Sequence, residues 1–166
     1  MKIEIRKIRL SDAKDSARCV SNKDIIKQIT GTPFPCPISH AKKTISKSLK
    51  NWKTKKAFNF AILVDNKFAG EIILENPDST KKIYEIGYYV GSDFWGKGVA
   101  TEAIKQASKF GFSKLHLVRI WAGTFEDNPA SGRALEKAGF KLEGIKRKSD
   151  FWKGKYVDSL MWAMVR

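Results

Sequence analysis

Residues 85–103 read Glu85-Ile86-Gly87-Tyr88-Tyr89-Val90-Gly91-Ser92-Asp93-Phe94-Trp95-Gly96-Lys97-Gly98-Val99-Ala100-Thr101-Glu102-Ala103, and this stretch decides the fold. Its first part is rich in aromatic and branched aliphatic residues, which predicts a strand. A glycine turn follows, and after it the apolar residues have helical spacing. Glycine lets the backbone approach a ligand closely, and the first N–H groups of a helix point outward. We therefore expect a phosphate group to bind at this turn.

The glycine spacing distinguishes this turn from two common phosphate-binding motifs. It lacks the third glycine of the dinucleotide motif, and no Ser or Thr follows Lys97 as a P-loop requires. The run Trp95-Gly96-Lys97-Gly98-Val99-Ala100 instead resembles the acyl-CoA-binding motif R/Q-x-x-G-x-G/A of the GCN5-related N-acetyltransferases (GNATs), with Trp where Arg or Gln is usual. Trp-Gly-Lys-Gly followed by Ala-Thr-Glu-Ala resembles the branch with ribosomal-protein N-terminal acetyltransferases and some spermidine acetyltransferases. An ordinary strand-to-helix turn is the alternative for this segment taken alone.

A second segment supports the same resemblance. Residues 128–140 read NPASGRALEKAGF and are similar to the family's N-x-x-S followed by a helix that ends in K-x-G-F. Asn128 is a good N-cap, Pro129 suits the first helical position, and Gly139 can end the helix. A well-capped amphipathic helix would have the same features, so the separation of the two motifs carries more weight than either motif alone.

The composition favours one compact domain that spans residues 1–166. The N-terminus alternates charged and apolar residues, and nowhere do about 18 apolar residues follow one another, so we expect a soluble, cytoplasmic protein without a membrane segment. Cys19 and Cys36 form no C-x-x-C pair, and the chain has only two histidines, His40 and His116. We therefore expect neither a disulfide framework nor a metal site.

The formal net charge of +15 is the most unusual global feature. It is compatible with association with the ribosome or RNA, with attraction of an anionic ligand, or with a generally basic surface. Lysines surround the expected helix near residues 39–52, whose apolar face carries Ile45, Leu49 and Trp52. That helix is either a solvated surface helix or a basic docking surface, and the sequence does not distinguish the two.

The rest of the chain predicts strands and helices in the order that the resemblance implies. We expect Asp65-Asn66-Lys67 and Asn76-Pro77-Asp78-Ser79 to form turns, and Ser11-Asp12 and Ser39 to cap helices. The implied fold is mixed α/β: a twisted, mostly antiparallel sheet of about seven strands with a parallel central pair, flanked by four to five helices. Strands are expected near residues 3–10, 58–64, 68–74, 83–90, 115–123, 140–145 and 156–165, and helices near 11–20, 24–29, 39–52, 99–110 and 128–139.

The resemblance implies acetyl-CoA as the co-substrate and a set of residues that hold it. The backbone of the turn would bind the pyrophosphate, and the pantetheine arm would pair with the end of the strand before it. Arg133 and Lys137 would reach either phosphate or solvent. The implied donor-binding residues are Tyr88, Tyr89, Val90, Trp95, Gly96, Lys97, Gly98, Val99, Ala100, Thr101, Asn128, Ser131, Arg133 and Lys137.

Acetyl transfer to an amine requires a base, an oxyanion donor and a proton for the departing thiolate. Glu85 is the best candidate base, with Glu71 as a weaker substitute, although Glu85 could instead be a plain carboxylate at the strand edge. The resemblance assigns the oxyanion donor to the backbone N–H of Val90. Many relatives carry a Tyr where this chain has Leu135, so Ser131 or solvent would protonate the thiolate.

The acceptor is expected between the proline-rich loop and the last hairpin. Phe34, Glu85, Trp121, Phe125 and Trp152 are the expected acceptor-binding residues, although the aromatic residues could be core. A protein N-terminal α-amine is the favoured acceptor, because its lower pKa leaves more of it neutral than a lysine side chain. A small amine or polyamine is the alternative, and carboxylates around the cleft would favour it. A CoA-binding or RNA-binding module without turnover is the non-enzymatic alternative, and a monomer or homodimer is expected.

Overall fold

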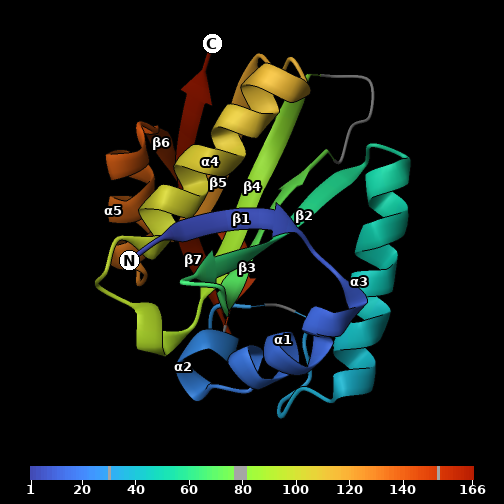
Figure 1. Cartoon of the computed structure of the whole chain (residues 1–166). Helices are drawn as coiled ribbons and strands as arrows, with labels where there is room; N and C mark the ends of the chain where they lie inside the picture. The colour runs from blue at the N-terminus through green and yellow to red at the C-terminus, as the bar shows by residue number, and fades with distance from the viewer. Residues whose placement is uncertain (30, 77–81, 153) are drawn as a thin grey trace.

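The computed structural model describes residues 1–29, 31–76, 82–152 and 154–166 and shows one seven-stranded sheet (Figure 1). Its strand order is β1-β2-β3-β4-β5-β7-β6, and every neighbouring pair is antiparallel except β4 and β5. The strands are β1 (Ile3–Lys7), β2 (Ala57–Val64), β3 (Lys67–Glu75), β4 (Ile83–Val90), β5 (Arg119–Phe125), β6 (Lys141–Trp152) and β7 (Lys155–Val165). The predicted mixed sheet with a parallel central pair is confirmed.

Among the described residues, five α-helices lie against the sheet, and each face has its own apolar cluster. The helices are α1 (Ala13–Val20), α2 (Lys23–Ile26), α3 (Ile38–Lys53), α4 (Val99–Lys114) and α5 (Pro129–Ala138). The larger cluster joins α4 and α5 to the sheet, and the smaller one joins α1 and α3 to the opposite face. Within the described ranges, no helix is long and apolar enough to cross a membrane.

Local sequence explains the elements around the central strand pair. Asp65 and Asn66 have φ values of 47° and 64°, as the tight turn between β2 and β3 requires. Asn128 accepts a hydrogen bond from the backbone N–H of Ser131, Pro129 begins α5, and Gly139 ends it in the left-handed region. The predicted caps of α5 are therefore confirmed.

One predicted cap position and several boundaries are wrong. Asp12 does occupy the predicted N-cap position of α1, but its carboxylate does not cap the helix, because it accepts hydrogen bonds from the Arg6 guanidinium and from the backbone of Arg9. Ser39 lies inside α3, whose N-cap is Pro37, so it does not cap that helix either. The expected helix near residues 24–29 ends already at Ile26. The turn expected at Asn76-Pro77-Asp78-Ser79 lies outside the described residues, except for Asn76.

Two strands in the C-terminal half of the chain, β5 and β6, also differ from their expected ranges. β5 begins at Arg119 rather than at Leu115, because the N–H groups of Leu115 and Leu117 both bind the carbonyl of Gly111 and complete the end of α4. β6 continues to Trp152, well beyond the predicted Ile145. Its polar, exposed residues carry no apolar alternation, which is why the sequence did not predict them as strand.

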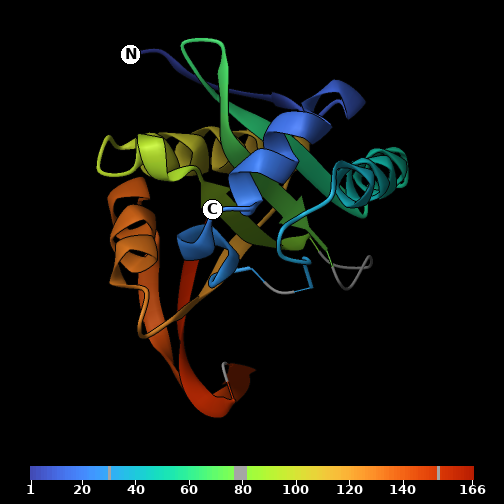
Figure 2. The ribbon, with the colours of Figure 1, turned by 90° about the horizontal axis from the view of Figure 1, so that it is seen from below.

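The hairpin of β6 and β7 curves away from the rest of the molecule (Figure 2). The register between the two strands shifts between Lys146 and Asp150, and Lys148 has a φ of 48°. The Asp158 carboxylate accepts a hydrogen bond of 2.8 Å from the backbone N–H of Lys148. A bulge of this kind bends a strand, so it accounts for the curve of the hairpin.

Candidate active site

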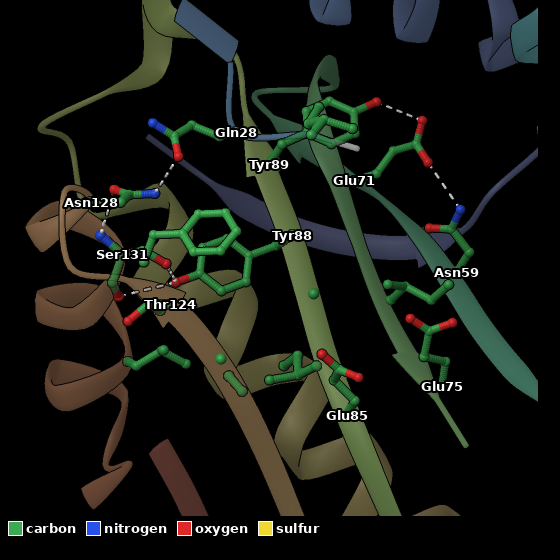
Figure 3. A pocket seen from close by; sticks show the side chains of 18 residues that line it. Gln28, Asn59, Glu71, Glu75, Glu85, Tyr88, Tyr89, Thr124, Asn128 and Ser131 are labelled. Carbon is green, nitrogen blue, oxygen red and sulfur yellow. Dashed lines mark hydrogen bonds between the residues drawn. The ribbon is translucent and has the colours of Figure 1, made fainter. Parts of the chain in front are cut away.

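A cavity of about 440 Å³ opens where β4 and β5 separate (Figure 3). The two strands pair only between Ile83–Glu85 and Arg119–Trp121, and beyond those residues no pairing joins them. β3 and the segment after α2 complete the cavity on one side, and α5 completes it on the other. Its polar lining consists of Gln28, Asn59, Glu71, Glu75, Glu85, Tyr88, Tyr89, Thr124, Asn128 and Ser131.

Three carboxylates line one side of this cavity, and we call them the carboxylate wall: Glu71, Glu75 and Glu85. Glu75 is the cross-strand partner of Glu85, and Glu71 is the partner of Tyr89. Because side chains alternate along a strand, these residues all point to the same face of the sheet. Within the described part of the chain, no cation lies within 4.0 Å of any of the three carboxylates.

The Glu71 carboxylate is held in place by neutral donors. Its Oε1 accepts hydrogen bonds of 2.6 Å from the Ser16 hydroxyl and 2.6 Å from the Tyr89 hydroxyl. Its Oε2 accepts one of 2.9 Å from the Asn59 side-chain amide. Burial, and after it the charge of the Glu71 carboxylate, raise the pKa of Tyr89 well above its usual value, so its hydroxyl stays protonated and remains a donor.

Glu85 is half-buried on β4, where it is the partner of Trp121 on β5. Burial is the main cause that raises the pKa of its carboxyl above the ordinary value, and the negative charge of Glu75 raises it further. Lys146 lowers that pKa but does not cancel the rise. A carboxylate with a raised pKa holds a proton more readily than an ordinary one, which is the property a general base needs.

Tyr88 and Ser131 lie on the other side of the cavity. The Tyr88 hydroxyl lies 2.7 Å from the Ser131 hydroxyl and donates to the Ser131 backbone carbonyl at 3.1 Å. Burial raises the pKa of Tyr88 to about 12. The neighbouring Leu135 is fully buried and also lines the cavity. The protonated Tyr88 hydroxyl on β4 therefore lies beside Ser131 and lines the same cavity as Leu135, the residue at the position where many relatives carry a Tyr.

We call residues 95–101 the donor loop: they follow the short 3-10 helix Ser92–Phe94 after β4 and include the first residues of α4. Gly96 and Gly98 have φ values of 72° and 76°, and a Cβ built on either meets no heavy atom within 4 Å. The N–H of Glu102 makes the first intrahelical hydrogen bond, to Gly98, so the N–H groups before it are free of helical partners. An open backbone with unpaired N–H groups at a helix start suits an anion such as pyrophosphate.

Two side chains of the donor loop donate hydrogen bonds to backbone carbonyls of the segment before it. The Trp95 indole N–H donates one of 2.6 Å to the carbonyl of Val90, a buried residue. The Lys97 ammonium donates one of 2.7 Å to the carbonyl of Asp93. Trp95 thus ties the loop to the end of β4, in the place where the family motif usually has Arg or Gln.

Two further cations lie beside the donor loop. A second cavity of about 530 Å³ brings together Gly98, Thr101, Lys105 and Lys137. Lys137 therefore lies near the loop, whereas Arg133 is exposed on α5 and lines neither of the two cavities. Lys105 was missed, because within an amphipathic helix it is indistinguishable from a solvated lysine.

The predicted acceptor-binding aromatics are only partly brought together. Phe125 lines the cavity, and Trp152 stacks on it with ring centroids 5.0 Å apart. Trp121 is the parallel-strand partner of Glu85 and carries the Lys146 ammonium over its ring. Phe34 is exposed on the proline-rich loop and does not line the cavity. The described residues contain no group of His, Cys, Asp or Glu that could hold a metal ion.

Four polar residues of the cavity were not predicted from the sequence: Gln28, Asn59, Glu75 and Thr124. The amide of Asn128 donates to Gln28 at 3.4 Å, and Asn59 contacts Glu71 as described above. Period-2 alternation gives one usable signal, because Glu71 and Glu75 are four residues apart and must share a face. The pairing of Glu75 with Glu85 depends on the strand register, which the sequence does not specify.

Comparisons with known proteins agree with this fold. A model of the acetyltransferase (GNAT) domain family matches residues 2–141. Uncharacterized N-acetyltransferase p20 of Bacillus licheniformis is 29% identical over 167 residues, which cover 99% of this chain and 93% of the relative. The microcin C7 self-immunity acetyltransferase MccE, solved with acetyl-CoA and AMP, is similar with a TM-score of 0.89 and 25% identity, over 99% of this chain and 93% of that chain. Mycobacterium smegmatis RimJ, solved with CoA-disulfide, has the same fold, with a TM-score of 0.89 and 24% identity over 98% of this chain and 81% of that chain. The chain therefore belongs to the acetyltransferase (GNAT) domain family and is an N-acetyltransferase.

Proposed function

We propose that the enzyme transfers an acetyl group from acetyl-CoA to a small, positively charged primary amine by direct attack of the amine. One observation carries this proposal. Tyr88, Asn128 and Ser131 line one side of the cavity, and the carboxylate wall lines the other. The first side has hydrogen-bonding groups for the thioester, and the second has negative charge for a cationic amine. The donor loop would hold the pyrophosphate, and the separation of β4 from β5 leaves room for the pantetheine arm.

Val90 is the proposed oxyanion donor. The N–H of Gly91 donates to the carbonyl of Ala69 on β3. Successive N–H groups of an extended strand point to opposite edges, so the N–H of Val90 is directed away from β3, toward the opening between β4 and β5. A fixed donor at a developing oxyanion contributes about 3 kcal/mol in comparable enzymes.

Glu85 is the proposed general base. The acceptor amine arrives largely protonated at neutral pH and must lose a proton before it can attack. Burial and Glu75 raise the pKa of Glu85, which brings its proton affinity closer to that of an amine. Glu85 takes this proton directly or through one water molecule and passes it to solvent.

Tyr88 and Ser131 are the proposed partners of the departing thiolate. Tyr88 stays protonated at neutral pH, because its pKa is about 12. A phenol with so high a pKa is a weak acid, so we assign it a hydrogen bond to the sulfur rather than complete proton transfer. The neighbouring Ser131 hydroxyl, 2.7 Å away, can relay a proton from solvent to the same position.

The carboxylate wall favours a cationic amine over the protein N-terminus predicted from the sequence. In a chain of net charge +15, three carboxylates without a cationic partner in the described structure form a local negative site. Such a site attracts an ammonium group despite the basic surface. A peptide α-amine is the competing acceptor, and the test below includes it.

The test measures thiol release from acetyl-CoA with small amines, polyamines and peptides that have a free α-amine. We expect turnover with cationic small amines, and a kcat lower by on the order of 100-fold or more in Glu85→Gln. Glu4→Gln is the matched control, because it removes a carboxylate from β1, outside the cavity. Turnover of peptides alone would overturn the acceptor assignment, and tight acetyl-CoA binding without turnover of any amine would overturn the whole proposal.

A further inference from the structure

α3 and the segment that follows it carry charges of one sign only. Residues 42–56 contain seven lysines, and no Asp or Glu occurs between Asp24 and Asp65. All seven are exposed, and we call them the lysine face: Lys42, Lys43, Lys47, Lys50, Lys53, Lys55 and Lys56. Within the described ranges, none of them has a carboxylate within 4.0 Å. The described part of the chain therefore does not neutralise this charge.

The five lysines within α3 lie on one side of the helix. At about 100° per residue they fall within an arc of about 140°, whose centre lies opposite the buried residues Ala41, Ile45 and Ser48. Figures 1 and 2 agree in placing α3 at one margin of the molecule, beside β2. The lysine face lines neither of the two cavities, so it is separate from the candidate active site.

This arrangement of lysines is unfavourable for the helix itself. Lys43 and Lys47 are four residues apart, and Lys47 and Lys50 are three apart, so like charges are neighbours on the helix surface. Such pairs destabilise a helix in water, whereas exposed helices gain stability when acidic and basic residues alternate at the same spacing. The compensating negative charges are those that a polyanionic partner would supply.

The lysine face has charge but no apolar centre. Among the described residues, Ile38 is the one large apolar residue of α3 that is exposed, and it begins the helix, ahead of the lysines. Protein interfaces have an apolar centre and few lysines, so a protein partner fits this surface poorly. Single strands bind by stacking bases on aromatic rings, but the Trp52 ring packs against Phe58 and Phe60. A nucleic-acid duplex needs only cations along its phosphates.

We propose that the lysine face binds the phosphate backbone of a nucleic-acid duplex without reading its sequence. The stretch from Lys42 to Lys53 covers about 17 Å of helix, and a duplex carries about ten phosphates over that length. Lysine is a compact point charge on a flexible stem, so its contacts with phosphate carry no sequence information and are available in RNA and DNA alike. The enzyme is thereby held at a duplex while both cavities stay open.

The test measures binding of the full chain to a fluorescent duplex of about 20 base pairs, made as RNA and as DNA, at several salt concentrations. We expect log K to fall with log salt with a slope of about −4.5, since each of five lysines contributes about −0.9. The combined variant Lys43→Gln, Lys47→Gln and Lys50→Gln should make the slope shallower by about 2 to 3. Thermal unfolding checks that this variant folds.

The matched control removes the same charge from the β6–β7 hairpin, at the sheet edge opposite β1 and β2. It combines Lys141→Gln, Lys148→Gln and Lys155→Gln, all at exposed positions, and it should leave the slope unchanged. An equal change of slope in both variants would overturn the proposal, because binding would then reflect the net charge alone.

Two further outcomes would also contradict the lysine face as a duplex-binding surface. The first is the absence of salt-dependent duplex binding by the unsubstituted enzyme, a measurement that needs no variant. The second is polyglutamate of equal charge binding as tightly as the duplex at the same salt concentration, which would indicate an acidic protein as the partner. None of these measurements uses acetyl transfer, so their outcome is independent of the proposed function.

Discussion

The donor loop borders the second cavity, the carboxylate wall lines the first, and the two regions present different chemical groups. The donor loop offers backbone N–H groups, two glycines in the left-handed region and nearby lysines. The carboxylate wall offers only acceptors, namely Glu71, Glu75, Glu85 and the free oxygen of Asn59. One side therefore suits an anion and the other a cation, which matches a phosphorylated donor and an ammonium acceptor.

Gly98→Val should damage the donor side alone. A Cβ at this position has free space, so the cost comes from the φ of 76°, which a β-branched residue adopts only with strain of roughly 1–2 kcal/mol. If the loop instead moves to relieve the strain, its N–H groups lose their alignment. We expect KM for acetyl-CoA to rise by about tenfold, with little change in KM for the amine.

Gly144→Val is the matched control for this substitution. Gly144 lies on β6, its φ is outside the left-handed region, and a Cβ built there also meets no heavy atom within 4 Å. It should leave both KM values near those of the unsubstituted enzyme. An equal rise of both KM values in Gly98→Val would show that the two sides are not independent.

Glu75→Gln should change how activity depends on pH. The proposed mechanism requires ionised Glu85, so kcat/KM for the amine should rise as pH increases through the pKa of this carboxyl. The negative charge of Glu75 is one cause of the raised pKa. Its removal should move this rise to lower pH, while Glu4→Gln should not move it. A pH profile of kcat/KM with one monoamine measures the shift, and an unchanged profile would mean that another group is the base.

The two sides also differ in how far the sequence could predict them. The glycine turn of the donor loop and the α5 caps depend on residues close together in the chain, so the turn at Gly96 and Gly98 and the caps Asn128 and Gly139 were predicted correctly. The mixed sheet with a parallel central pair followed from the family resemblance. In contrast, the carboxylate wall depends on the register that sets Glu75 opposite Glu85, and on Asn59 from a third strand. No local pattern specifies that register, so the wall became visible only in the folded chain.

Boundaries were mispredicted where tertiary contacts overrule local preference. Asp12 has the right residue type for a cap, but the Arg6 guanidinium and the Arg9 N–H compete for its carboxylate. That pairing lowers the pKa of Asp12 despite its burial. Asp12 and Glu85 are thus two partly buried carboxylates with pKa shifts of opposite direction, since only Asp12 has a cation within ion-pair distance.

This contrast gives the smallest predicted effect, an increase in stability in Glu85→Gln. The pKa of Glu85 is higher in the folded than in the unfolded chain, so the folded protein binds more protons in that pH range and loses stability as pH rises through the folded pKa. Gln carries no charge and avoids this loss. We expect the free energy of unfolding at pH 7 to rise by roughly 0.5 kcal/mol, and the gain to vanish toward about pH 3, where Glu85 is protonated in both states.

Thermal or urea unfolding of the variant at several pH values measures this gain. For Asp12 the sign is reversed: its stabilising contribution is present above the unfolded pKa and is lost as pH falls through the folded one. Asp12→Asn should therefore lower stability at pH 7, which makes it the matched comparison. A loss of stability in Glu85→Gln at pH 7 would mean that the Glu85 charge supports the fold. A gain would mean that the fold tolerates an unfavourable charge at Glu85, which is expected of a carboxylate placed for the acceptor.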